Sequence, residues 1–115
     1  MNKLITVAVI DSGIYPHIDF KNRIVAFKDF VNGRKNAYDD CGHGTHVSGI
    51  IAGSGYASHG RIKGICPAAS LAGIKVLDRL GNGRIENVLD AAGWIISHQK
   101  DLNIRVVNIS FGATT

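Results

Sequence analysis

Four short apolar runs recur along the chain, at residues 4–10, 23–28, 71–76 and 104–110. The first is almost entirely apolar and rich in β-branched residues, a pattern typical of a strand buried on both faces of a parallel sheet. It ends at Asp11-Ser12-Gly13, which is a polar turn. We therefore predict four strands, with polar groups where the first one ends.

Two stretches between these runs have helical periodicity. Residues 43–52 predict a short helix with Val47, Ile50 and Ile51 on its buried side. Residues 84–98 predict a longer amphipathic helix, because apolar residues recur there at three- and four-residue spacing. That stripe consists of Ile85, Val88, Leu89, Ala92, Ile95 and Ile96. Trp94 lies off it, so we expect this side chain to be partly exposed or packed against a part outside the chain.

Strands alternating with helices indicate an α/β fold, a doubly wound parallel sheet with right-handed crossovers, in one domain over residues 1–115. A dinucleotide-binding domain has the same alternation. However, Asp11-Ser12-Gly13 is not the Gly-x-Gly-x-x-Gly turn that such a site needs. The sequence therefore gives no support to a dinucleotide site.

Composition and charge narrow the classes of function. The formal charge of +4 is modest and the basic residues are scattered, so we expect no nucleic-acid partner. No apolar run is long enough to span a membrane, and the first residues lack the layout of a signal peptide, which favours the cytoplasm. Cys41 and Cys66 are expected to be free thiols in a reducing compartment. Cys41 lies close enough to His43 in sequence to be sensitive to thiol reagents.

The candidate chemistry begins with Asp11 and His43. In open α/β sheets, ligand sites gather beyond the carboxyl ends of the strands, where Asp11 lies. Asp11 could instead be a turn-forming residue that caps local backbone. His43 and His46 are three residues apart, without the i, i+4 spacing and intervening Glu of a zinc helix. We interpret His46 as a packed, hydrogen-bonded structural histidine. We interpret Gly44 and Gly49 as positions where the backbone must approach other backbone or the substrate closely.

Two motifs, Asp11-Ser12-Gly13 and then His43-Gly44-Thr45-His46-Val47-Ser48-Gly49, resemble the active-site segments of the subtilisin-like serine proteases, the subtilase family. The resemblance implies a serine endopeptidase in which Asp11 is the orienting carboxylate and His43 the general base and acid. It covers essentially the whole chain but about the first half of a catalytic domain. The nucleophilic Ser and the oxyanion-hole Asn are expected downstream of residue 115.

The same resemblance implies a substrate cleft with two edges. One contains Gly81, Asn82 and Gly83, after Lys75-Val76-Leu77, and the other contains Ser110, Phe111 and Gly112. A peptide or protein substrate would add to these edges as an extended strand. The 115-residue chain alone is expected to be inactive. Because a partial sheet exposes apolar surface and an unpaired edge, its expected partners are the Ser-bearing segment, a companion chain or a second copy.

No cofactor is expected for the chemistry, although a structural calcium ion is considered. Asp19 lies in a segment that resembles the one from which the family binds calcium. The loop at 54–61, which would face it, contains no Asn or Asp, so the match is weak. Asp39 and Asp40 are a second pair of candidate calcium ligands, but adjacent carboxylates without an ordered ligand series are usually part of a solvated loop.

Two other classes of function remain open at this point. The first is a non-catalytic peptide-binding module, or pseudoprotease, with the same half-fold. The second is an α/β domain that binds a small ligand.

Overall fold

The computed structural model describes residues 4–111 as a four-stranded parallel sheet. The strand order is β2-β3-β1-β4, which confirms the predicted parallel α/β fold. The strands are β1 (Thr6–Asp11), β2 (Ile24–Asp29), β3 (Ser70–Lys75) and β4 (Ile104–Ile109). Since β1 pairs in parallel with both β3 and β4, the carboxyl ends of these three strands lie at one edge of the sheet.

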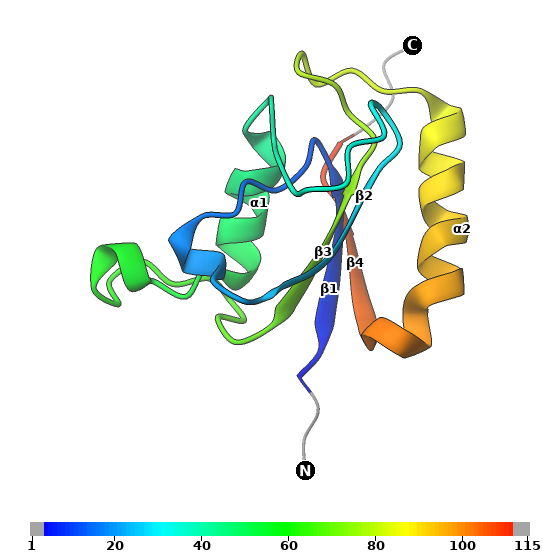
Figure 1. The fold of residues 1–115 in the computed structure, drawn as a ribbon. Coiled ribbons are helices and arrows are strands. Elements are labelled where there is room, and N and C mark those ends of the chain that lie inside the picture. The colour runs from blue at the N-terminus through cyan, green and yellow to red at the C-terminus, as the bar shows by residue number, and fades with distance from the viewer. Residues whose placement is uncertain (1–3, 112–115) are drawn as a thin grey trace.

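Helix α1 (His43–Ala52) lies on one face of the sheet and α2 (Ile85–Leu102) on the other, as Figure 1 shows. The short 3-10 helices η1 (Ile18–Phe20) and η2 (Tyr56–Ser58) lie on the α1 side, where the sequence predicted only loops. The two central strands, β1 and β3, are therefore covered on both faces, whereas β4 is largely exposed. None of the helices in residues 4–111 is long and apolar enough to cross a membrane.

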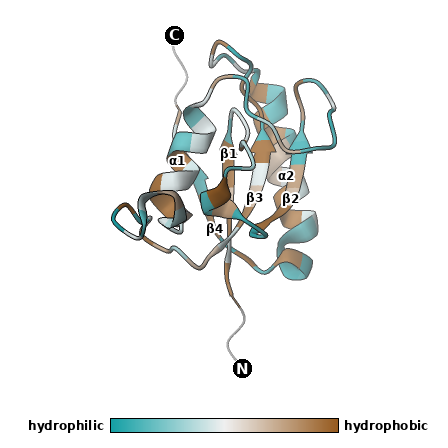
Figure 2. Cartoon of the chain, turned by 60° about the vertical axis from the view of Figure 1, so that its left-hand side comes forward, coloured by the Kyte–Doolittle hydropathy of each residue, from teal (hydrophilic) through white to brown (hydrophobic). Residues whose placement is uncertain are grey.

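Alternate residues of β1 belong to the two hydrophobic cores. Ala8 and Ile10 pack on the α2 side, whereas Val7 and Val9 pack on the α1 side. All six residues of β1 are buried, as the continuous apolar run predicted. In Figure 2 the hydrophobic colouring is concentrated in the central strands, and the loops around them are mostly hydrophilic.

The buried face of α1 differs from the predicted one. Its fully buried residues are Gly44, Ser48 and Ala52, which are spaced four apart, while Ile50 is 53% exposed. The prediction that Ile50 is buried was therefore wrong. Small side chains on the inner face let the helix backbone lie close to the sheet, and this turns the large aliphatic residue outward.

Helix α2 shows a second difference, because its predicted apolar stripe points largely outward. Ile85, Leu89 and Ile96 are exposed, and the buried residues are Ala91 and Ile95. Trp94 is half-buried against the α2-side core and stacks on the His98 ring at 4.2 Å between centroids. Its expected partial exposure is thus confirmed.

Helix α2 continues to Leu102, four residues beyond the predicted end. Leu102 packs against the core, and Asn103 ends the helix in a left-handed conformation, at φ 54°. The Asn103 N–H caps the helix by donating to the carbonyls of Gln99 and Lys100.

The hydroxyl of Ser48 generates a first prediction, because it is buried without a hydrogen-bond partner among the described residues. An unpaired buried hydroxyl carries a desolvation penalty of about 1–3 kcal/mol. We expect Ser48→Ala to leave the free energy of unfolding unchanged or to raise it by about 1 kcal/mol, measured by denaturant unfolding.

The matched control is Ser97→Ala on the exposed side of α2, where the hydroxyl donates to the carbonyl of Gly93. That change is expected to alter the stability by less than about 0.5 kcal/mol. A Ser48→Ala protein that is clearly less stable than wild type would show that the hydroxyl has a partner.

Candidate active site

The structure brings Asp11 and His43 into direct contact. Asp11 ends β1 and His43 begins α1, so two elements that are 32 residues apart meet at the carboxyl edge of the sheet. The Nδ1 atom of His43 lies 2.8 Å from Oδ1 and 3.0 Å from Oδ2 of Asp11. The Asp11 side chain is fully buried, whereas that of His43 is 47% exposed.

The contact determines which nitrogen of His43 faces solvent. A carboxylate only accepts hydrogen bonds, so Nδ1 carries the proton and Nε2 is the unprotonated nitrogen of the neutral ring. Among the described residues, Nε2 has no hydrogen-bond partner, and it belongs to a half-exposed side chain. It is therefore available to take a proton from a group outside the described chain.

The main chain around Asp11 is fixed from both sides. The Ser12 N–H donates to Asp11 Oδ1 at 2.7 Å. Asp11 therefore also caps its own turn, which was the second possibility that the sequence left open. The Asp11 carbonyl accepts from the N–H groups of Val76, at 2.9 Å, and Leu77, at 3.2 Å. These bonds leave the carboxylate little freedom to turn away from His43.

Asp39 holds the start of α1, and it is not the solvated loop residue that the sequence suggested. Its carboxylate accepts five hydrogen bonds at distances between 2.6 and 3.1 Å. The donors are the Ser12 hydroxyl, the N–H groups of Cys41 and Gly42, and both the N–H and the hydroxyl of Thr45. A carboxylate at this position satisfies free N–H groups and suits the positive end of the helix dipole.

Burial by itself raises the pKa of Asp39, but the hydrogen bonds from Thr45, Gly42 and Ser12 favour the charged form more strongly. The net result is a pKa below the ordinary value of 3.8. Asp39 is therefore a charged cap that ties the turn after β1 to the first turn of α1. Asp39 lies three residues before the N-cap Gly42, outside the usual capping position, so the sequence contained no signal for this role.

The turn after β1 and the first turn of α1 touch through glycines. A Cβ atom at Gly44 would lie 2.2 Å from the carbonyl oxygen of Gly13 and 3.2 Å from Cβ of Asp11. The Gly44 N–H also donates to the Ser12 hydroxyl at 2.9 Å. The predicted close approach at Gly44 is therefore present, and it is what allows His43 to reach Asp11. At Gly49 a Cβ atom would meet nothing within 4 Å, so the predicted close approach to other backbone is not found there.

His46 and the cysteines lie away from this contact. His46 is exposed and its ring makes no hydrogen bond within residues 4–111, so its interpretation as a packed structural histidine was wrong. It lies one turn along α1, where the outer surface of the helix faces solvent. Cys41 and Cys66 are free and exposed.

The predicted cleft residues follow the strands that flank β1. Gly81, Asn82 and Gly83 lie in an exposed loop after β3, where Gly83 forms an antiparallel bridge with Leu77. Ser110 and Phe111 follow β4, and the Ser110 hydroxyl donates to Asn108. Gly112 lies outside the described residues. Both segments are at the same edge of the sheet as Asp11, and their role in substrate binding stays a prediction.

Asp19, the weak candidate for a calcium ligand, bonds to the loop after α1. Its Oδ1 atom accepts a hydrogen bond from the N–H of Ala57, at 2.8 Å. A structural calcium ion at this position stays a prediction. Within the described part of the chain, no three His, Cys, Asp or Glu side chains are grouped to hold a metal.

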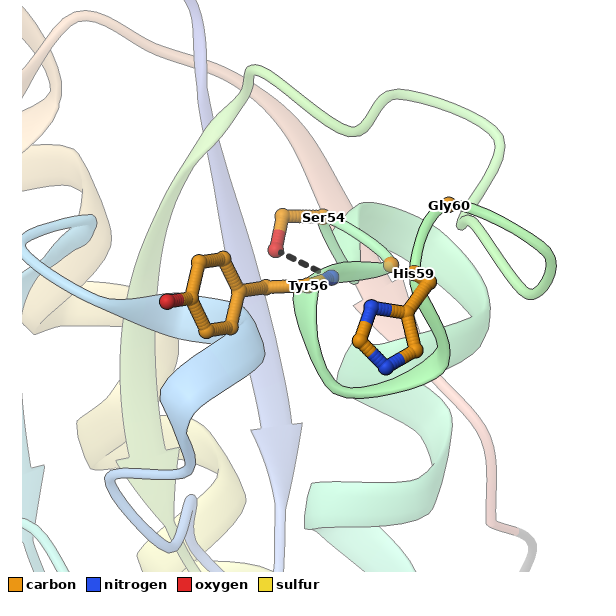
Figure 3. Close-up of a pocket in the computed structure, with 5 residues that line it drawn as sticks. Ser54, Tyr56, His59 and Gly60 are labelled. Carbon is orange, nitrogen blue, oxygen red and sulfur yellow. Dashed lines mark hydrogen bonds between the residues drawn. The ribbon is translucent and has the colours of Figure 1, made fainter.

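That loop contains a pocket of about 470 Å³, lined by Ser54, Gly55, Tyr56, His59 and Gly60. In Figure 3 the side chains of Tyr56 and His59 point in different directions, and the Ser54 hydroxyl accepts from the Tyr56 N–H at 3.2 Å. The lining includes neither Asp11 nor His43. This pocket is therefore separate from the candidate active site.

The close approach at Gly44 can be tested by adding one methyl group. We expect Gly44→Ala to lower the free energy of unfolding by roughly 1–3 kcal/mol, because the new Cβ must displace backbone. Gly49→Ala on the same helix is the control, since a Cβ there meets nothing within 4 Å. It should raise the stability by up to about 1 kcal/mol. Equal stabilities in denaturant unfolding would contradict the close approach.

The pKa of Asp39 predicts how stability depends on pH. Since folding lowers this pKa, the carboxylate stabilises the folded state above its ordinary value of 3.8, and this contribution is lost as the pH falls through the lower, folded-state value. Asp39→Asn should therefore cost about 1–2 kcal/mol at pH 7, and the difference from wild type should shrink below pH 3.8.

Denaturant unfolding across the pH range measures that difference. Asp90→Asn on the exposed face of α2 is the control, and it should change the stability by less than about 0.5 kcal/mol throughout. If the Asp39→Asn deficit is as large at low pH as at pH 7, the charge of Asp39 does not stabilise the cap.

Proteins with similar sequences show which family this chain belongs to. The model of the subtilase family, Peptidase S8, matches residues 2–115. The serine protease AprX of Bacillus subtilis is 46% identical over 99 residues, which are 86% of this chain and 22% of that protein. Subtilisin E, from the same species, is 40% identical over 113 residues, 96% of this chain and 28% of that protein.

A solved structure agrees with these relatives. The crystal structure of a cold adapted subtilisin-like serine proteinase superposes with a TM-score of 0.77 at 32% identity, and the match covers 96% of this chain and 38% of that one. The chain thus spans well under half the length of the relatives that it matches. With a family model that matches nearly every residue, the chain belongs to the subtilase family.

Proposed function

We propose that this chain supplies the carboxylate and the imidazole of a serine endopeptidase that hydrolyses peptide bonds through an Asp-His-Ser triad. One observation carries the proposal: a fully buried Asp11 carboxylate lies 2.8 Å from Nδ1 of a half-exposed His43. Membership of the subtilase family supports the same reaction.

In this mechanism His43 moves the proton and Asp11 orients the ring. The Nε2 atom of His43 takes the proton of a serine hydroxyl as that oxygen attacks the substrate carbonyl, and later gives the proton to the leaving amine. Asp11 keeps the ring in the tautomer that leaves Nε2 unprotonated, and its charge stabilises the imidazolium that forms. Its burial strengthens this effect, since water does not screen the pair from the inner side.

The proposal assigns the nucleophile and the oxyanion-hole donor to residues outside these 115. Two hydroxyls near the site are engaged elsewhere, because Ser12 donates to Asp39 and Ser110 donates to Asn108. We therefore expect the 115-residue chain alone not to hydrolyse peptides. A Ser-bearing segment or companion chain is its functional partner, and no cofactor takes part in the chemistry.

A peptide substrate is proposed to lie along the loop at 81–83 and the segment at 110–112. These two segments follow β3 and β4, the neighbours of β1, so they flank the strand that ends in Asp11. The loop at 81–83 is exposed, and an extended peptide would bind there mainly through its own main chain.

The test is to join the chain to the Ser-bearing segment and measure covalent labelling by a fluorophosphonate together with peptide hydrolysis. We expect labelling of the joined protein, and a loss of about 10²–10⁴-fold in its rate when His43 is changed to Ala. His46→Ala is the matched control, because His46 is exposed on the same helix, and it should keep the wild-type rate.

Labelling that is absent although both segments are folded would sink the proposal, and so would full labelling of the His43→Ala protein. Tight binding of extended peptides without any labelling, unaffected by His43→Ala, would instead favour the non-catalytic peptide-binding module.

A further inference from the structure

Lys75, the last residue of β3, has a buried ammonium group. It pairs in register with Asp11 on the neighbouring strand, and its side chain is fully buried. Lysine is almost never fully buried unless its charge is paired and its donors are used. The partners of the ammonium group therefore decide why a lysine can be buried beside the candidate active site.

The ammonium group has three N–H donors, and each has one acceptor. Nζ lies 2.6 Å from the carbonyl oxygen of Ser12, 2.7 Å from that of Leu77 and 2.7 Å from Oδ1 of Asp40. The Tyr38 ring also lies beneath the charge, with its centroid 5.2 Å from Nζ. All three protons are thus used, and no donor remains for a substrate.

The three acceptors come from three separate segments. Ser12 follows Asp11 directly, Asp40 lies in the loop that leads into His43, and Leu77 is in the segment after β3. The Leu77 N–H also donates to the Asp11 carbonyl. One buried cation therefore joins the turn that carries the carboxylate to the loop that carries the imidazole.

We propose that Lys75 is a positioning residue, which sets the separation of Asp11 and His43 by tying the Ser12 carbonyl and the Asp40 carboxylate to one point. It acts through these two groups and does not touch substrate. Asp40 is an exposed loop residue, as the sequence suggested, and its carboxylate is also the counter-charge of this cation. In the same loop, Asp39 accepts a hydrogen bond from Thr45 of α1, and the next residue, Asp40, accepts one from Lys75 of β3.

This role rests on the proposed function, since a positioning effect is measured on the reaction that His43 serves. Displacing a catalytic group by about 1 Å can cost about 10²-fold in rate without loss of substrate binding. The expected signature of losing Lys75 is thus a fall in kcat with little change in KM. A purely structural role would lower the stability and the amount of folded protein, and leave kcat per folded site unchanged.

The experiment uses the chain joined to the Ser-bearing segment, with Lys75→Met as the main variant, because Met is unbranched like the aliphatic part of lysine and lacks the ammonium donors. We expect kcat per titrated active site to fall about 10²-fold and KM to stay within about threefold. Lys28→Met is the matched control, since Lys28 is an exposed strand lysine on β2, and it should keep the wild-type kcat.

A second variant and a spectroscopic readout keep the test decisive if Lys75→Met does not fold. Asp40→Ala removes one acceptor at a half-exposed site and should lower kcat about tenfold. In proton NMR, the His43 Nδ1–H resonance of wild type should shift or be lost in either variant. Unchanged kcat and an unchanged resonance in folded protein would overturn the positioning role. A wild-type protein without turnover would overturn the proposed function, while the resonance alone would still decide whether Lys75 positions His43.

Discussion

The hydrogen bond between Nδ1 of His43 and the carboxylate of Asp11 joins two segments that are 32 residues apart, at the point where a strand ends and a helix begins. It requires the two backbones to meet within van der Waals distance. Gly44 supplies that distance, since any larger residue would overlap the carbonyl of Gly13. The buried residues of α1 are all small, namely Gly44, Ser48 and Ala52, so the helix lies close to β1 along its length.

Charged groups on either side of the contact fix the relative positions of the segments that carry Asp11 and His43. Asp39 and Lys75 are of opposite sign, and each is saturated with hydrogen bonds from more than one segment. An unpaired buried charge would be very costly, so the surrounding loops can adopt few arrangements other than the one that satisfies both. The loop at 38–42 is thus held from two directions, although its backbone contains little regular structure.

The sequence predicted the strands, and the two residues that meet at their carboxyl edge, better than it predicted the packing of the helices. The strands and the residues Asp11 and His43 were identifiable because apolar runs and short motifs are local signals. The orientation of α2 was not, since residues 85–96 carry apolar side chains on two faces and periodicity alone cannot tell which one meets the sheet. Asp40 and Lys75 gave no local signal, because they form a pair across 35 residues that exists only once the sheet is assembled.

The exposed apolar residues show where the packing of the chain could not be predicted from its sequence. On α2, Ile85, Leu89 and Ile96 face outward, and on β4 so do Val106, Val107 and Ile109. These six lie on elements that follow β3, and others, such as Ile50 on α1 and Ile65 in the loop after it, come before β3. By contrast, β1 is buried along its whole length and contains the Asp11 carboxylate. The carboxylate of Asp11 and the ammonium group of Lys75 are therefore paired within the described chain, on or beside a fully buried strand. The contact between Asp11 and His43 thus involves neither α2 nor β4, the two elements on which these six apolar residues are exposed.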